Sequence, residues 1–301
     1  MLEITSRRRG WRVRAPAKVN LTLRVLGVRP DGHHALESVV AGVSLLDTLT
    51  AEPDDRLTLA CEGHAVPEGE GNLVLAAART LQETCGVRAG ARLHLEKRIP
   101  PGRGFGGGSS DAAAALVALD RLWGCGLERE ALVRLGVGLG SDVPLFFGTP
   151  VGVMRGRGEV IEPVETRCGW RLALAWPPEP LSTAEVYAAW DRLPARERPR
   201  PAATDILSAL HGPARAAKPF LVNDLEQAAD NVKGGRLDLR ACLQEAGAEA
   251  VGMTGSGSAY FALADDEAQA RHWAHAAHAA GAETYVAVLL GDGNEQQENT
   301  P

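Results

Sequence analysis

The sequence predicts an α+β fold of two domains, from its length and from the order of its hydrophobic patterns. A chain of 301 residues is long enough for two ordinary domains. Alternating apolar residues, typical of strands, are interspersed with apolar residues at three- and four-residue spacing, typical of helices. We expect one domain over residues 10–165 and a second over 166–290, with the boundary near Glu162–Gly169. The polar ends, residues 1–9 and 291–301, are predicted to be disordered.

Composition and charge argue against several classes of protein. The fractions of 45% hydrophobic and 23% charged residues are typical of a soluble globular chain. A net charge of −6 argues against a nucleic-acid partner, and no apolar run approaches the roughly 18 residues of a membrane span. The five cysteines are scattered and never in C-x-x-C spacing, which indicates a reducing compartment and offers no metal site. No signal segment begins the chain, so we expect a cytoplasmic protein without a membrane partner.

The first strand pattern runs from Trp11 to Val25, where odd positions are apolar and nearly all even positions are polar. This pattern predicts a half-buried antiparallel strand that Pro16 bends or interrupts. Lys18 and Asn20 then project from the same face, about 7 Å apart. A solvated strand face would explain both residues. The chain has only four lysines among its 32 basic residues, however, so Lys18 also indicates a functional role.

Further hydrophobic patterns fill both halves of the chain. The first half is predicted to hold strands over Leu36–Leu46, Leu57–Cys61 and Arg92–Glu96, and helices over Asn72–Cys85 and Glu128–Leu139. The second half is predicted to hold strands over Trp170–Trp176, Glu249–Met253, Ala259–Ala264 and Glu283–Leu290, and helices over Ser182–Trp190, Leu221–Asn231, Asp238–Ala246 and Glu267–Ala280. Proline- and charge-rich connections are expected over Arg192–Pro201 and His211–Pro219.

A glycine-rich stretch, Ile99–Asp111, leads into a strong helical pattern. Five of its residues are glycine, and the apolar residues after it recur at three- and four-residue spacing. We expect Ser109, Ser110 or Asp111 to cap this helix. Free backbone N–H groups and the positive end of a helix dipole together favour an anion, so the stretch predicts a phosphate-binding loop. A glycine-rich turn without a ligand is the alternative.

Two common phosphate loops do not fit this stretch. The dinucleotide-binding loop follows a buried strand directly, whereas Pro100-Pro101 intervenes here. The nucleoside-triphosphatase loop ends in a lysine, and no lysine follows these glycines.

The stretch instead resembles the P-x-G-x-G-L-G-G-G-S-S-D/N signature of the GHMP kinase superfamily, with Phe105 in place of the leucine. Other segments resemble motifs of the 4-diphosphocytidyl-2-C-methyl-D-erythritol kinase family within that superfamily. These segments are Ala15–Leu21, Arg29–His34, Leu139–Pro144, Asn223–Glu226 and Gly252–Gly257. The resemblance covers roughly Ala15 to Leu290.

The resemblance implies a two-domain GHMP kinase fold. Its N-terminal domain would be ribosomal-protein-S5-domain-2-like, and its C-terminal domain would be a ferredoxin-like α/β sandwich. The implied activity is ATP-dependent phosphorylation of the 2-hydroxyl of 4-diphosphocytidyl-2-C-methyl-D-erythritol, giving the 2-phosphate and ADP, in the non-mevalonate isoprenoid pathway. Alternatives are another small-molecule kinase of the superfamily, such as a homoserine or mevalonate kinase, or a catalytically inactive ligand-sensing relative. A monomer or weak homodimer is expected.

The resemblance also implies a role for residues at the phosphoryl donor. Asp142 would accept the proton of the attacking hydroxyl, and Lys18 would lie beside it. From sequence alone, Asp142 could equally be a helix N-cap before Pro144, and a Lys–Asp pair could be an inert salt bridge. ATP would be held by Pro101, Gly102, Gly104, Gly106, Gly107, Gly108, Ser109 and Ser110. Mg²⁺ would accompany ATP near Ser109 or Ser110, without a cluster of metal-binding side chains.

A second set of residues is implied at the acceptor substrate, a cytidine diphosphate-linked methylerythritol. Asn20 would help to place this molecule, and His34 would hydrogen-bond the cytosine edge. The family usually has Tyr where this chain has His33, which would stack on the base with less area. Tyr187 would face the other side of the base, or would simply pack in the core. The turn containing Thr254 and Gly255 would form a second wall near the phosphates.

Overall fold

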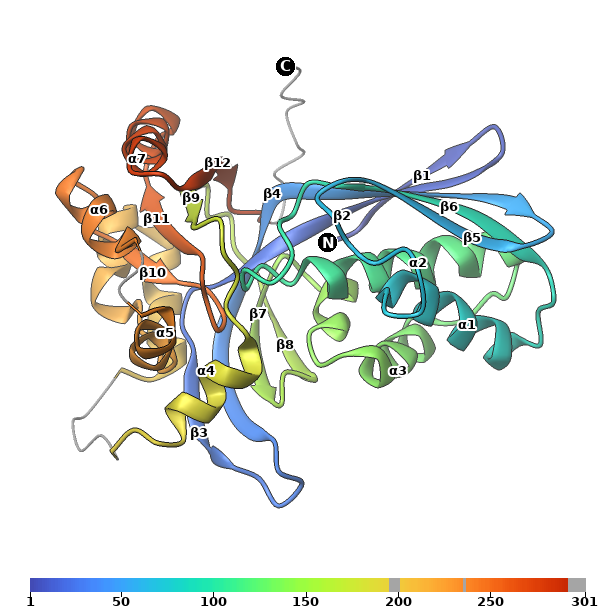
Figure 1. Ribbon diagram of the computed structural model, residues 1–301, viewed down its shortest axis with the longest axis horizontal. Helices are drawn as coiled ribbons and strands as arrows, with labels where there is room; N and C mark the ends of the chain where they lie inside the picture. The colour runs from blue at the N-terminus through green and yellow to red at the C-terminus, as the bar shows by residue number, and fades with distance from the viewer. Residues whose placement is uncertain (195–200, 235–236, 292–301) are drawn as a thin grey trace.

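The computed structural model describes residues 1–194, 201–234 and 237–291, which build two β-sheets with helices on their outer faces. Figure 1 shows a large sheet over helices α1, α2 and α3 at one end of the long axis, and a small sheet with helices α6 and α7 at the other. This mixed architecture confirms the predicted α+β class. No helix in these described ranges is both long and apolar enough to span a membrane.

Eight strands of the described residues form the large sheet, in the order β1-β2-β4-β6-β5, with β3 and β7 on the remaining length of β4 and β8 beside β7. All neighbours are antiparallel except β5 and β6. The strands are β1 (Glu3–Arg7), β2 (Gly10–Asn20), β3 (Arg24–Val28), β4 (His34–Asp54), β5 (Leu57–Gly63), β6 (Gly90–Lys97), β7 (Val151–Gly156) and β8 (Val160–Val164). The register of β2 on β4 shifts between Pro16 and Ala17, which confirms the predicted interruption.

The N-terminal end is ordered, so the prediction of a disordered tail over residues 1–9 is wrong. Residues Glu3–Arg7 pair with β2 as strand β1. The side chains of Leu2 and Ile4 pack against the core under the sheet, which gives this short strand an apolar anchor. The expected C-terminal tail lies outside the described residues apart from Gly291.

Helices α1 (Leu73–Cys85), α2 (Gly107–Trp123) and α3 (Arg129–Leu139), with the short helix η1 (Val143–Phe147), cover one face of the large sheet. The predicted caps of α2 are wrong. Gly106, with φ of 70°, occupies the N-cap position and offers no side chain, whereas Ser109, Ser110 and Asp111 lie inside the first turns. A run of fully buried alanines, Ala112–Ala115, lets α2 approach the sheet closely.

A buried charge cluster fixes the start of α2 to the sheet. Lys97 Nζ, at the end of β6, donates to Asp47 of β4 and to Asp111 Oδ2 of α2, the latter at 2.8 Å. Asp47 Oδ1 also accepts from the backbone N–H groups of Arg98 and Ile99, at 2.6 and 2.8 Å. Burial raises the pKa of Asp111 well above its usual range, although the nearby Lys97 charge opposes this shift. The cluster therefore ties together three elements around the glycine stretch.

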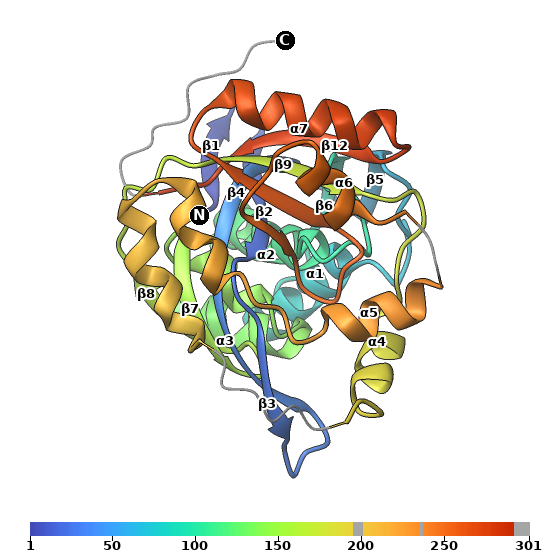
Figure 2. The ribbon, with the colours of Figure 1, turned by 90° about the vertical axis from the view of Figure 1, so that its left-hand side faces the viewer.

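Four strands of the described residues form the small antiparallel sheet, in the order β10-β11-β9-β12. They are β9 (Arg171–Trp176), β10 (Val251–Met253), β11 (Tyr260–Ala264) and β12 (Glu283–Val288). Helices lie between β9 and β10 and between β11 and β12, so the chain follows the expected ferredoxin-like βαββαβ order. The helical segments are α4 (Thr183–Trp190), η2 (Ala203–His211), η3 (Ala214–Phe220), α5 (Glu226–Lys233), α6 (Leu239–Glu245) and α7 (Glu267–Ala279). Figure 2 shows α7 lying along β9 and β12.

Two predictions for the second half need correction. The helix expected over Leu221–Asn231 begins only at Glu226, because the preceding residues bind the backbone of β3 and of the turn after β10. The connection expected over His211–Pro219 contains the short helix η3. Most of the connection Arg192–Pro201 lies outside the described residues.

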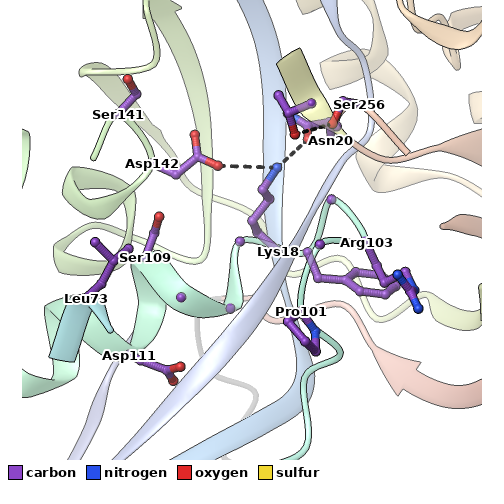
Figure 3. Close-up of a pocket in the computed structure, with 18 of the residues that line it drawn as sticks. Lys18, Asn20, Leu73, Pro101, Arg103, Ser109, Asp111, Ser141, Asp142 and Ser256 are labelled. Carbon is purple, nitrogen blue, oxygen red and sulfur yellow. Dashed lines mark hydrogen bonds and ion pairs between the residues drawn. The ribbon is translucent and has the colours of Figure 1, made fainter. Parts of the chain in front are cut away.

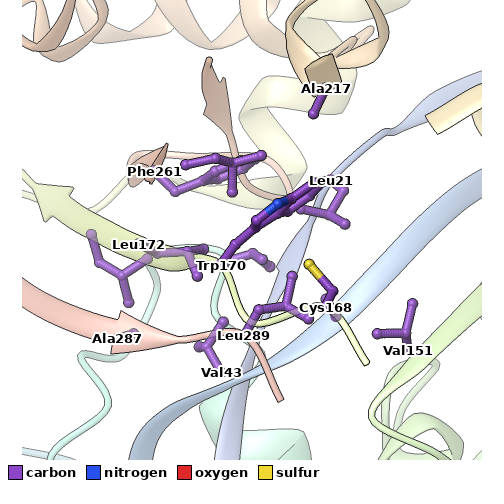
Figure 4. Close-up of a cluster of buried hydrophobic side chains, with 14 of the residues drawn as sticks. Leu21, Val43, Val151, Cys168, Trp170, Leu172, Ala217, Phe261, Ala287 and Leu289 are labelled. Atoms are coloured by element: carbon purple, nitrogen blue, oxygen red, sulfur yellow. The ribbon is translucent and has the colours of Figure 1, made fainter. Parts of the chain in front are cut away.

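The two sheets share one hydrophobic core. Figure 4 shows Val43 and Val151 of the large sheet beside Trp170, Leu172 and Leu289 from the second half. Backbone contacts continue this junction, since Leu290 N donates to Gly42 O at 2.9 Å. The domain boundary near Glu162–Gly169 stays a prediction, although the chain does pass between the sheets in that region.

Because Asp111 is buried, we expect the stability of the Asp111→Asn variant, relative to wild type, to increase with pH. A carboxyl whose pKa is raised on folding binds more protons folded than unfolded, so wild-type stability falls as pH rises above about 4. Asparagine mimics the protonated carboxyl and avoids this loss. We expect the free energy of urea unfolding of the variant, relative to wild type, to increase on the order of 1 kcal/mol between pH 5 and pH 8. Asp55→Asn, at an exposed position, is the control, and a constant difference for Asp111→Asn would contradict the assignment.

Candidate active site

A pocket of about 880 Å³ lies where the glycine stretch meets both sheets. Its lining comes from β2, from the β3–β4 hairpin, from the glycine stretch and α2, and from the turns before η1 and after β10. Figure 3 shows Lys18 and Asn20 of β2 facing Asp142, with Ser109 at the start of α2 below them. The fold thus brings residues far apart in the sequence to one site.

The glycine stretch forms a loop between β6 and α2 whose shape depends on its glycines. Gly102, Gly104 and Gly106 have φ of 69°, 86° and 70°, so alternate residues are left-handed. A Cβ on Gly104 would lie 2.3 Å from the Thr254 carbonyl oxygen, and one on Gly106 would lie 3.0 Å from Lys18 Cγ. Alternating backbone of this kind forms a concave surface of N–H groups that suits an anion.

The start of α2 completes this surface. The first N–H bonded within the helix is that of Ser110, to Gly106 O at 3.0 Å, so the N–H groups of Gly107, Gly108 and Ser109 precede the ladder. Ser109 lines the pocket. Ser110 does not: its side chain is fully buried, and its hydroxyl has no partner among the described residues. The structure therefore brings Ser109, and not Ser110, to the place expected for phosphate or metal.

Lys18, Asn20 and Asp142 form a compact polar cluster (Figure 3). Lys18 Nζ lies 2.6 Å from Asn20 Oδ1 and 3.6 Å from Asp142 Oδ2. Lys18 is only 4% exposed, so the interpretation as a solvated strand face is wrong for this residue. Asp142 occupies the N-cap position of η1, but its side chain makes no capping hydrogen bond. Its carboxylate is therefore available to the pocket.

Thr254, in the turn after β10, links the glycine loop to β2. Its hydroxyl accepts from Asn20 N at 3.0 Å and donates to Gly104 O at 3.2 Å. Thr254 is fully buried and does not line the pocket, whereas Gly255 does. Thr254 thus acts on the pocket through the residues that it holds.

Asn223 supports this turn, a role that its sequence motif did not indicate. Its side-chain N–H group donates to Met253 O and to Gly255 O, both at 2.9 Å, on either side of Thr254. Its Oδ1 accepts from Leu225 N at 2.9 Å. The short segment before α5 therefore fixes the turn from behind.

One arm of the pocket carries aromatic and imidazole rings. The rings of His34 and Tyr187 lie 4.6 Å apart and 32° from parallel, and Trp190 meets His34 edge-on at 5.4 Å. His34 Nε2 lies 2.8 Å from Asp191 Oδ1. Burial, with a smaller effect from Asp142, raises the pKa of Tyr187. His33 also lines the arm, with a side chain that is 58% exposed.

The opposite arm was not predicted from the sequence. It is lined by side chains from the segment before α1, from α1 itself and from β6, namely Val66, Pro67, Asn72, Leu73 and Leu95. Asp111 closes it, and its Oδ1 has no partner among the described residues. The apolar pattern of α1 predicted a helix here. It could not show that some of these side chains line a pocket, because apolar residues of a pocket wall and of the core give the same pattern. Within the described part of the chain, no group of three acidic, histidine or cysteine side chains could hold a metal ion.

Comparisons with known proteins agree with this geometry. Residues 72–148 match the family model "GHMP kinases N terminal domain", and residues 221–283 match "GHMP kinases C terminal". The fold and the glycine loop are thus those of a GHMP kinase. A homoserine kinase from Cytophaga hutchinsonii is similar in fold, with a TM-score of 0.68 at 19% identity over 96% of this chain and 98% of that one.

More similar relatives narrow the assignment. A 4-diphosphocytidyl-2-C-methyl-D-erythritol kinase from Salinispora tropica is 44% identical, covering 86% of this chain and 85% of that protein. One from Pelotomaculum thermopropionicum is 41% identical, covering 85% and 90%. A solved 4-(cytidine 5'-diphospho)-2C-methyl-D-erythritol kinase gives a TM-score of 0.78 at 37% identity, covering 93% and 99%. The chain belongs to the 4-diphosphocytidyl-2-C-methyl-D-erythritol kinase family.

Thr254→Val predicts a loss of activity without a loss of fold. Valine keeps the volume but leaves Asn20 N and Gly104 O unpaired, at a cost of about 1–3 kcal/mol for each buried group. We expect kinase kcat/KM to fall about tenfold or more, while urea unfolding stays cooperative. Thr254→Ser keeps the hydroxyl and should retain most activity. Wild-type kcat/KM in Thr254→Val would contradict this role.

Proposed function

We propose that the protein phosphorylates the 2-hydroxyl of 4-diphosphocytidyl-2-C-methyl-D-erythritol with ATP, giving the 2-phosphate and ADP. The observation that carries this proposal is the Asp142 carboxylate 3.6 Å from the buried Lys18 ammonium, in the pocket that the glycine loop lines. The names of the relatives that cover most of the chain support the substrate. The scattered cysteines support a cytoplasmic location.

The donor fits the side of the pocket formed by the loop. Backbone N–H groups of the loop and of the α2 N-terminus are suited to the triphosphate, with Pro101, Gly102 and Gly104 in the wall. The apolar arm around Leu73 is suited to the flat base of ATP. Mg²⁺ keeps several waters and binds protein through few oxygens, so the Ser109 hydroxyl, which lines the pocket, fits it. When bound, Mg²⁺ would neutralise charge on the phosphates.

The acceptor fits the side of the pocket where Asp142 and the imidazole arm lie. Asp142 would accept the proton of the attacking hydroxyl, and such a base contributes about 10²–10⁴-fold to rate. Lys18, whose Nζ lies 3.6 Å from that carboxylate, would stabilise negative charge on the transferring group. His34 and Tyr187 offer rings and a polar edge to the cytosine. Asn20, held by Thr254, would orient Lys18.

This ring-lined arm also bears on the alternatives. Homoserine and mevalonate carry no base, so a kinase for either would not need the arm around His34. A ligand sensor would not need a carboxylate beside a buried ammonium. The proposal is tested by incubating the protein with Mg-ATP and each of a panel of alcohols, and by measuring the ADP released. We expect turnover with the cytidine substrate and none with homoserine or mevalonate, and the reverse preference would refute it.

Asp142→Asn should remove catalysis while ATP binding remains. The amide keeps the shape of the side chain but cannot accept the proton, so we expect kcat to fall by about 10²–10⁴-fold. Steady-state ADP release measures kcat, and equilibrium titration with ATP measures binding. Turnover near the wild-type value would exclude Asp142 as the base.

Lys18→Arg should also be damaging, although the charge is kept. The Lys18 side chain runs against the glycine loop, where a Cβ on Gly106 would already lie 3.0 Å from Cγ. A guanidinium is larger and planar and cannot replace the ammonium between Asn20 and Asp142. We expect kcat/KM to fall by about tenfold or more. A fully active variant would show that any cation suffices here.

A further inference from the structure

Four lysine or arginine side chains contribute to the lining of the pocket, and three of them make hydrogen bonds or ion pairs within the protein. Lys97 is held by Asp47 and Asp111, and Lys18 by Asn20 and Asp142. The guanidinium of Arg103 donates through Nη2 to the carbonyl of Pro178, and although its Nε and Nη1 have no partner among the described residues, Figure 3 shows it directed away from Asp142. The remaining one is Arg157, which also lines the pocket; its charge acts on Glu159, but no ion pair within 4.0 Å joins it to a residue that the structure describes.

Arg157 lies in the turn between β7 and β8, flanked by two glycines that have φ of 75° and 120°. The second of these, Gly158, packs against the reaction centre, since a Cβ there would lie 3.5 Å from Asp142 Oδ1. On its other side the turn meets the β3–β4 hairpin, where Arg29 Nη1 lies 3.9 Å from Glu159 Oε1. That hairpin carries His33, and β4 begins at His34. Arg157 is therefore placed between Asp142 and the imidazole arm.

An acceptor that reaches from Asp142 to the imidazole arm around His34, and that carries a diphosphate between its two ends, needs a cation between these places. If its alcohol is at Asp142 and its cytosine is at His34, then its diphosphate crosses the intervening space. The glycine loop cannot supply both sets of phosphate contacts, because it serves the donor. Glu159 is the acidic residue nearest in sequence, and its single charge is shared between Arg157 and Arg29. The charge of Arg157 is therefore only partly balanced, at the place where about two negative charges would lie.

We propose that Arg157 binds the diphosphate of the acceptor and so selects acceptors that carry one. This inference rests on the proposed function and adds the residue that recognises the linking group. A guanidinium presents parallel N–H groups that match phosphate oxygens, which gives both affinity and orientation.

Equilibrium binding of CDP and cytidine to the full chain tests this directly, by isothermal titration calorimetry. In the wild type, CDP should bind more tightly than cytidine. Arg157→Ala should weaken CDP binding by about 10- to 100-fold and leave cytidine binding within about twofold. Arg157→Lys, which keeps the charge but loses the planar fork, should give an intermediate value for CDP.

Arg155 provides a matched control two residues away. Its guanidinium pairs with Glu37 at 3.2 Å and with Glu162 at 2.6 Å, and it does not line the pocket. Arg155→Ala should leave the ratio of CDP to cytidine affinity unchanged. Titration with ADP separates the two phosphate sources, and Arg157→Ala should not change ADP affinity.

Three results would overturn the inference. Wild-type CDP affinity in Arg157→Ala would show that the guanidinium does not contact the diphosphate. Equal losses for CDP and cytidine would show that the turn only shapes the base arm. Equal losses for CDP and ADP would assign Arg157 to the donor. Failure of the wild type to phosphorylate the cytidine substrate would instead contradict the proposed function, and these binding measurements distinguish the two failures.

Discussion

The pocket depends on how the glycine loop is held between the two sheets. On one side, Lys18 N donates to Phe105 O at 2.9 Å. On the other, the Thr254 hydroxyl donates to Gly104 O, and the ring of Phe105 meets that of Trp176 at 5.5 Å. A Cβ atom added at Gly104, Gly106 or Gly107 would lie 2.3, 3.0 or 2.8 Å from a neighbouring atom. Glycine is therefore required at these positions by the close packing of the loop, whether or not a phosphate is bound.

The two buried lysines near this loop differ in their ion-pair partners. Lys97 is held between the side chains of Asp47 and Asp111, and this cluster anchors the start of α2. Lys18 has a single carboxylate partner at 3.6 Å, on a side chain that is 32% exposed. Both lysines line the pocket, but among the described residues Lys97 has two acidic partners, whereas Lys18 has only one, at a longer distance. Burial alone does not distinguish these two lysines, because both are less than 5% exposed.

Much of this could be predicted from the sequence where local pattern and structure coincide. The helix after Asn72 and the strand interruption at Pro16 follow from local chemistry, namely a side-chain cap and a missing donor. The start of the helix expected over Leu221–Asn231, which the structure places at Glu226, could not be predicted in this way. Asn223 and Asp224 bind backbone groups of Met253 and Val25, which are distant in the sequence and cannot be inferred from spacing.

The candidate site likewise contains residues that the sequence motifs identified and residues that they did not. Lys18, Asn20, Asp142, His34 and Ser109 reach one pocket, as the motifs implied, while the roles assigned to them stay proposals. Ser110 and Thr254 face protein instead. Ser110 lies about 100° around α2 from Ser109, and the Thr254 hydroxyl binds Asn20 N and Gly104 O. The arm around Leu73 and the cation at Arg157 carry no signature that a single sequence reveals.

The core shared by the two sheets has a consequence for how substrates enter. Val43 and Leu289 meet at its centre, and Leu290 continues the contact in the backbone. Hinge rotation of one half away from the other would break this apolar seam and expose it to water. Substrate entry that leaves this seam intact must therefore take place at the pocket rim, which includes the hairpin around His33.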